Sequence, residues 1–198
     1  IECYLYSVMS ANQFEYHNLN PQELWIKLCE GDIKALTALF NNNFDSLYNY
    51  GYRIVSNTDL VRDSIQEVFY NLWKYRNNLN QPDSVEAYLY ISLRRQLLRK
   101  KENIKRREDV NKKYFSEEFD ALLNYQVWQE ALDLEKEKKE DLKEAIADLT
   151  PRQREVIYLK YFEGLSTDEL AEILQIRAQS IYNLVHDALE NLRIFLND

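Results

Sequence analysis

Apolar residues recur at intervals of three and four along much of the chain, and this spacing constrains the fold more than any other feature. Within residues 59–79, the apolar side chains that repeat in this way are Val61, Ile65, Val68, Phe69 and Leu72. The interval matches the 3.6-residue turn of an α-helix rather than the two-residue alternation of a strand. Only three Gly and three Pro interrupt the 198 residues. Together these patterns predict an all-α fold.

Helix-start signals divide the chain into two helical domains. Asn20-Pro21 and Thr150-Pro151 each place a capping residue before a proline at the first helical position. The predicted organisation has four ranges, namely an N-terminal arm over 1–20, a four-helix domain over 21–107, an acidic linker over 108–139 and a three-helix domain over 140–198.

Inside the first domain, short polar signals set the expected helix boundaries. We expect Asp32 to cap the second helix, Asp59 to cap the third and Ser84 to start the fourth. Gly31 and Gly164 are expected to end helices. Gly51 lies inside the second helical pattern and weakens its helix propensity by roughly 1 kcal/mol.

The formal net charge of -8 hides an uneven distribution. Residues 94–113 hold ten basic and three acidic side chains, whereas residues 114–148 hold four basic and eleven acidic ones. Like-charge blocks of this kind are usually solvated surfaces. In a chain that is otherwise acidic, the basic block is nevertheless the candidate for contact with nucleic acid.

Several function classes lack support in the sequence. Two cysteines and two histidines give neither a disulfide framework nor a metal site. No set of nucleophile and base and no phosphate-binding loop is present, so we expect neither an enzyme, nor a cofactor, nor a small-molecule substrate. No apolar run approaches the ~20 residues of a membrane span, and the expected location is the cytoplasm.

Residues 166–185 have the spacing of a helix-turn-helix. Ala171 supplies the small residue where two helices cross, and Ser166 or Thr167 can cap the first helix. The turn carries Gln175, where such turns often carry Gly, and a glutamine there requires a strained or rearranged backbone. An ordinary pair of packed helices is the alternative. If the motif is present, the second helix begins near Ala178, and the side chains able to contact DNA are Arg177, Gln179, Ser180 and Asn183.

With these segments in view, the chain resembles the bacterial RNA polymerase sigma factors of the sigma-70 family, in particular the extracytoplasmic-function (ECF) group. Residues 149–193 look like the sigma-4 domain, and residues 39–76 look like the sigma-2 domain with its D-x-x-Q-E-V-F pattern. The resemblance covers roughly residues 22–107 and 140–198. It implies a two-domain factor that gives core polymerase its promoter specificity.

The resemblance also implies partners and sites. In this family the D-x-x-Q-E helix docks on a coiled coil of the polymerase β′ subunit, and the β flap is a second expected contact. On this chain the matching polar stripe is Asp63, Gln66, Glu67, Tyr70 and Lys74. A stripe like this is otherwise most often a solvated helix face. Promoter DNA is the other expected partner, and an anti-sigma factor is a further one.

The loop over 77–83 and the fourth helix correspond to the segments that melt the promoter and hold its -10 element. Melting uses a polar loop, stacking aromatics and a basic groove. The residues expected to serve here are Asn80, Tyr88, Arg94, Arg95, Arg99 and Lys101, with Tyr90 and Lys100 nearby. The second helix of the helix-turn-helix is expected to bind the -35 element.

Two alternatives remain at this point. The acidic linker can mimic the RNA that it replaces in the polymerase channels, or it can simply be a solvated segment. The whole chain can also be a sigma-like interaction protein that sequesters a regulator without binding DNA. That reading explains the acidic final domain, but it explains neither the basic block nor Gln66 and Glu67.

Overall fold

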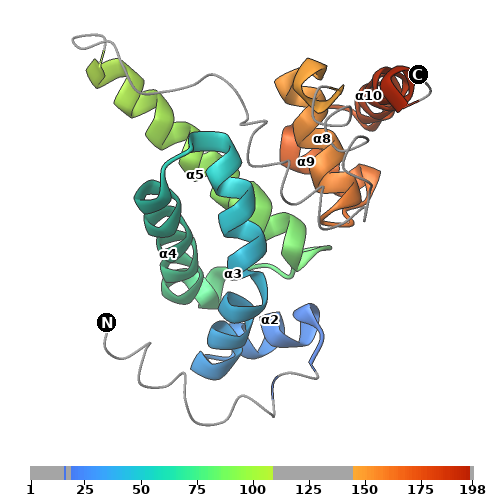
Figure 1. Cartoon of the computed structure of the whole chain (residues 1–198). Helices are drawn as coiled ribbons and strands as arrows, with labels where there is room; N and C mark the ends of the chain where they lie inside the picture. Colours follow the sequence, from blue (N-terminus) through green and yellow to red (C-terminus); the bar gives the residue numbers. More distant parts are fainter. Residues whose placement is uncertain (1–15, 17–18, 109–144, 197–198) are drawn as a thin grey trace. The chain divides into compact units, whose positions relative to one another are not determined.

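The computed structural model describes Tyr16 and residues 19–108 and 145–196, with side chains in these ranges except at 105–108 and 194–196. The described residues form helices joined by loops, with no strand among them (Figure 1). The all-α prediction is confirmed. The acidic linker lies outside the described residues apart from its first position. None of the described helices is long and apolar enough to cross a membrane.

The helices follow in one order along the chain. They are α2 (Pro21–Cys29), α3 (Ile33–Val55), α4 (Thr58–Tyr75), the short 3₁₀ helix η1 (Arg76–Asn78), α5 (Val85–Glu108), α8 (Pro151–Tyr161), α9 (Thr167–Leu174) and α10 (Ala178–Leu196). Residues 145–148 are also helical.

Side-chain caps begin most of these helices where the sequence predicted. Asn20 and Glu23 form a reciprocal capping box at the start of α2, and Asp32 accepts a hydrogen bond from the Lys34 N–H at 2.9 Å before α3. The predicted cap of α4 is wrong. Asn57, not Asp59, has the extended backbone of a cap, and its Oδ1 accepts from the Leu60 N–H at 2.9 Å.

The segment after α4 also differs from the prediction. The helical pattern was expected to run to residue 79, but α4 ends at Tyr75 and the chain tightens into η1. The Arg76 guanidinium donates to the Trp73 carbonyl at 2.8 Å and lies 4.3 Å from the Trp73 ring centroid. These contacts satisfy a carbonyl at the helix end and fix where the following loop begins. Ser84 then caps α5, because its Oγ accepts from the Ala87 N–H at 3.1 Å.

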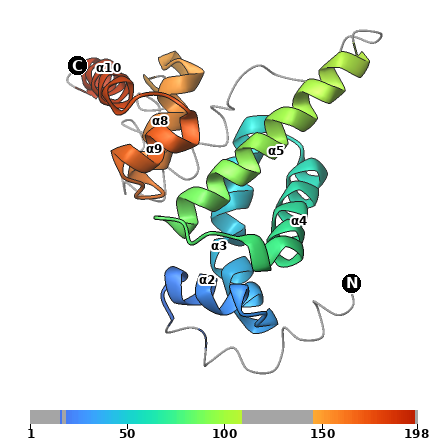
Figure 2. The same ribbon diagram turned by 180° about the vertical axis from the view of Figure 1, so that it is seen from behind.

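The core around α3, α4 and α5 explains the glycine inside α3. Gly51 is buried, and a Cβ there would lie 2.9 Å from Val61 Cγ1 and 3.2 Å from Leu97 Cδ1. The close approach of three helices therefore requires a residue without a side chain, although the helix loses propensity at that position. The ribbons of α3, α4 and α5 run side by side in both views (Figure 2).

Two compact units account for the described residues. One comprises those within residues 1–51 and 57–97, and the other those within 52–56 and 98–198. The predicted boundary at residue 107 falls in α5, and the boundary at residue 140 falls outside the described residues. The four predicted ranges therefore stay predictions. Of the arm over 1–20, Tyr16 is described, and its hydroxyl donates to Asp32 Oδ2 at 2.6 Å.

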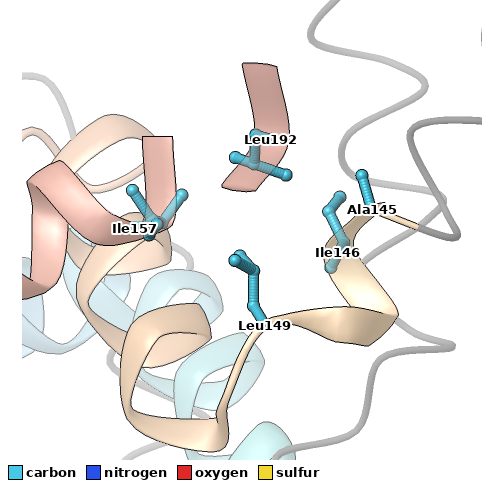
Figure 3. Packing of buried hydrophobic residues seen from close by; sticks show 6 residues of the cluster. Ala145, Ile146, Leu149, Ile157 and Leu192 are labelled. Atoms are coloured by element: carbon cyan, nitrogen blue, oxygen red, sulfur yellow. The ribbon is translucent and has the colours of Figure 1, made fainter. Parts of the chain in front are cut away.

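The last helices pack around a small apolar cluster. Thr150 and Gln153 form a capping box that starts α8, with Pro151 at the first position, as predicted. The side chains of the cluster come from the helical turn before α8, from α8 and from α10 (Figure 3), and they are Ala145, Ile146, Leu149, Ile157, Ala188 and Leu192. This cluster fixes α10 against α8 and so positions the helix-turn-helix.

Candidate nucleic-acid and protein interfaces

One face of α4 carries the polar stripe that the sequence singled out. Asp63, Gln66 and Lys74 are exposed, Glu67 is half-buried, and Tyr70 keeps 52% of its surface exposed. The Lys74 ammonium lies 5.9 Å from the Tyr70 ring centroid. The apolar residues that repeat at helical spacing along α4 are all buried, namely Val61, Ile65, Val68, Phe69 and Leu72. Four of the five predicted stripe residues are therefore exposed, and the fifth, Glu67, is half-buried.

The loop before α5 presents polar side chains. Asn80 is exposed, as is Asn77 in the preceding η1, and Tyr88 in the first turn of α5 is half-buried, with its ring 5.0 Å from the Trp25 ring in an edge-to-face arrangement. Tyr90, which was expected near the stacking aromatics of the -10 surface, differs from that prediction. It is 4% exposed and its ring packs against Tyr50 at 5.1 Å, so it belongs to the core and has no face left for a base.

The described part of the basic block lies along α5. Arg95 and Arg99 are exposed and share a face at helical spacing, with Arg94 on the adjoining surface. Lys101 is half-buried, and its ammonium donates to the Ile54 carbonyl at 3.5 Å, near the end of α3. A cation at that position stabilises the carbonyl end of the helix. Arg95 and Arg99 are thus the exposed cations among the described side chains of this block.

The helix-turn-helix has the geometry that the spacing predicted. Ser166 caps α9 through a capping box with Glu169. After α9, the Gln175 N–H donates to the Glu172 carbonyl and the Ile176 N–H donates to the Ala171 carbonyl at 3.1 Å. This pair of bonds is the Schellman motif, which needs a left-handed residue. Gln175 supplies it with φ 56° and ψ 43°, so the turn is strained rather than rearranged.

Buried apolar residues hold the two helices of this motif together. Leu170, Leu174 and Ile181 are at most 2% exposed. The Arg152 guanidinium on α8 also donates to the Leu174 carbonyl at 2.7 Å, which satisfies a terminal carbonyl of α9. As a result α10 leaves the turn in a fixed direction from Ala178, the residue that the sequence predicted.

The first turns of α10 gather the predicted DNA-contacting side chains. Arg177, Gln179 and Asn183 are exposed and Ser180 is half-buried. Gln179 Nε2 donates to Asn183 Oδ1 at 3.1 Å, so the two amides form one polar unit on the surface. Amide and guanidinium groups of this kind pair with base edges and phosphates in a major groove.

Two residues near these surfaces were missed by the sequence reasoning. Tyr182 on α10 is 60% exposed beside Asn183, and an aromatic residue in a polar stretch was the available signal. Gln22 on α2 contacts the loop before α5 through hydrogen bonds described below. No sequence signal indicated that contact, because the partners are about 60 positions apart.

Family comparisons match both halves of the chain. Residues 39–107 match the family Sigma-70 region 2, and residues 139–192 match Sigma-70, region 4. The predicted core-binding and -10 residues fall in the first segment, and the predicted -35 residues fall in the second.

Curated relatives align along most of the chain. It is 24% identical over 169 residues to the ECF RNA polymerase sigma factor SigE of Mycolicibacterium smegmatis, an alignment that covers 84% of this chain and 64% of the relative. It is also 24% identical over 164 residues to the RNA polymerase sigma factor SigV of Bacillus subtilis, covering 81% of this chain and 90% of that protein.

Solved structures share the fold. CnrH, solved in complex with the cytosolic domain of CnrY, superposes with a TM-score of 0.57 at 16% identity, covering 89% of this chain and 97% of CnrH. The sigma factor RpoE, solved with the anti-sigma factor NepR from Bartonella quintana, gives a TM-score of 0.57 at 20% identity, covering 83% of this chain and 98% of that one.

Proposed function

Because the chain belongs to the sigma-70 family of RNA polymerase sigma factors, in its extracytoplasmic-function group, we propose that it gives core polymerase promoter specificity and initiates transcription of a stimulus-specific set of genes. The observation that carries this proposal is the presence of both regions on one chain, in order, each with its own exposed polar surface. A protein that only sequestered a regulator would need neither the cations on α5 nor the amides on α10.

Different surfaces of the chain bind polymerase and promoter DNA. The α4 stripe over residues 63–74 binds the β′ coiled coil, and the C-terminal helix-turn-helix approaches the β flap. The first turns of α10 bind the -35 element through Arg177, Gln179, Ser180 and Asn183. The loop before α5 and the basic face of α5 hold the melted -10 element, with Asn80, Tyr88, Arg94, Arg95, Arg99 and Lys101 as the contacting residues. The chain binds and positions, and the polymerase carries out the chemistry.

Charge determines how tightly the free protein can hold DNA. With a formal net charge of -8, the isolated chain carries a net electrostatic repulsion toward a polyanion. We therefore propose that it binds duplex DNA weakly when free and reads a promoter only in the holoenzyme, where polymerase supplies much of the DNA contact.

An anti-sigma factor is the remaining proposed partner. The similar sigma factor RpoE was solved in complex with the anti-sigma factor NepR. We propose that a protein of this class occupies the polymerase-binding surface of the present chain until an inducing stimulus releases it.

Binding to core polymerase tests the proposal at its first step. The variant Gln66→Ala/Glu67→Ala removes two polar groups from the α4 stripe, and Asp45→Ala removes an exposed acid from α3 as the matched control. We expect core affinity to fall about tenfold or more in the first variant and to be unchanged in the control. Equal affinity of wild type and the double variant would remove α4 from the interface.

A further inference from the structure

The loop between η1 and α5, residues 79–84, lies against the first turn of α2. Gln22 Nε2 donates to the Pro82 carbonyl at 3.2 Å and to the Asp83 carbonyl at 3.0 Å. Gln81 Nε2 donates in turn to Gln22 Oε1 at 3.3 Å. One amide side chain therefore contacts three successive residues of the loop.

Gln22 itself is held in place by the start of its helix. Pro21 occupies the first helical position, where its ring fixes the backbone φ angle. The Asn20 N–H donates to Glu23 Oε2 and the Glu23 N–H donates to Asn20 Oδ1, both at 2.9 Å. Leu24 is fully buried two positions after Gln22. The capping box and the burial of Leu24 therefore fix the backbone from which the Gln22 side chain reaches the loop.

The same helix also supports the aromatic residue that follows the loop. Trp25 is 1% exposed, and its ring meets the Tyr88 ring edge-on at 5.0 Å and 70°. Tyr88 lies one turn into α5, after the Ser84 cap. α2 thus fixes both ends of the surface that is proposed to take up the -10 bases, the polar loop and the tyrosine.

The orientation of the loop backbone leaves its side chains available. The Pro82 and Asp83 carbonyls face α2, while the side chains of Asn80 and Asp83 are exposed. A loop without helix or strand pairing loses conformational entropy when it orders around a ligand. Hydrogen bonds that order it beforehand reduce that cost and favour the ligand that fits the ordered shape.

We propose that Gln22 is a positioning residue that sets the conformation of the loop over 79–84 and thereby the base preference at the -10 element. The proposal rests on the proposed sigma-factor function. Gln22 acts through the loop, so its removal should alter which bases are selected rather than whether polymerase is bound.

Transcription from a pool of promoters with a randomised -10 region tests this directly. Holoenzymes with wild type, Gln22→Met, Gln22→Glu and Lys27→Met are compared by sequencing their transcripts. Gln22→Met removes all three hydrogen bonds, and Gln22→Glu places carboxylate oxygens against two carbonyls while keeping the acceptor for Gln81. Lys27→Met is the matched control on the same helix.

We expect both Gln22 variants to weaken base preference in the -10 region about tenfold, with -35 preference and core affinity unchanged. Lys27→Met should match wild type. An unchanged -10 preference in Gln22→Met would overturn the proposal. A uniform loss of transcription with a lower melting temperature would also overturn it, because the role of Gln22 would then be structural. Failure of the wild-type holoenzyme to select any sequence would instead refute the sigma-factor function.

Discussion

Replacing Gln175 by glycine should stabilise the protein, because this residue occupies the left-handed position of the turn inside the helix-turn-helix. An L-residue in that conformation costs about 1–2 kcal/mol, and glycine avoids the cost. Glycine also adds about 0.4–1 kcal/mol of conformational freedom to the unfolded chain, which opposes the gain. The expected increase in the free energy of unfolding is about 0.5–1 kcal/mol.

A glycine already occupies the equivalent position at the end of α2, and it allows the reverse change, from glycine to a residue with a Cβ, to be tested. α2 ends in the same Schellman hydrogen-bond pattern, with the Gly31 N–H donating to the Leu28 carbonyl at 2.9 Å and the Asp32 N–H donating to the Lys27 carbonyl at 2.9 Å. Gly31 has φ 93° there. A Cβ at Gly31 would have Arg76 Nε at 3.7 Å, an ordinary contact, so Gly31→Ala isolates the backbone cost. It should lower stability by about 0.5–1 kcal/mol.

Thermal unfolding of the full chain measures both effects. A change of 1 kcal/mol shifts the melting temperature of a chain of this length by about 2–4 °C, so Gln175→Gly should raise it by about 1–4 °C. Gln175→Ala keeps the Cβ and should leave it nearly unchanged. A lower melting temperature in Gln175→Gly would show that Gln175 does not strain the turn. An equal rise in Gln175→Gly and Gln175→Ala would show that the gain in stability does not come from relief of backbone strain.

Three further predictions concern other parts of the chain. Gly51→Ala should lower the free energy of unfolding by about 1 kcal/mol, because overpacking costs about 1–3 kcal/mol and the gain in helix propensity is about 1 kcal/mol; urea unfolding measures it. Partial burial alone would raise the pKa of Asp32, but hydrogen bonds from the Tyr16 hydroxyl and from backbone N–H groups outweigh it and hold that pKa below its usual range. The stability it contributes is therefore present above the carboxyl's unfolded pKa and lost as pH falls through the folded one, so Asp32→Asn should flatten the acid limb of a pH–stability curve. Arg95→Gln/Arg99→Gln should reduce the salt slope of holoenzyme binding to single-stranded -10 DNA by about 1 or more, and an unchanged slope would exclude phosphate contact by both side chains.

Local signals predicted the helices well where the deciding interaction is close in sequence. The capping boxes at Asn20 and Thr150 involve residues three positions apart, so the sequence shows both partners. Asn57 and Asp59 show the limit of such signals. Both are good caps, and the choice depended on which residue kept an extended backbone after α3.

Features that depend on tertiary contact were missed or left open. The sequence could not show that Gly51 faces Val61 and Leu97, nor that Tyr90 is directed to the core while Tyr88 stays near the surface. The support of the loop by Gln22 was invisible for the same reason, because its partners are about 60 residues away. The turn at Gln175 could be predicted in part, since such turns often carry Gly and a glutamine there indicated a strained or rearranged backbone, but not which of the two.

Run-off transcription with core polymerase on genomic promoter fragments tests the central claim most directly. We expect initiation at defined start sites when the chain is added, and loss of that initiation when Arg94, Arg95 and Arg99 are all replaced by alanine while core binding persists. Co-purification of the wild-type chain with core polymerase but without initiation on any fragment would contradict the account and favour a sigma-like protein that sequesters a partner.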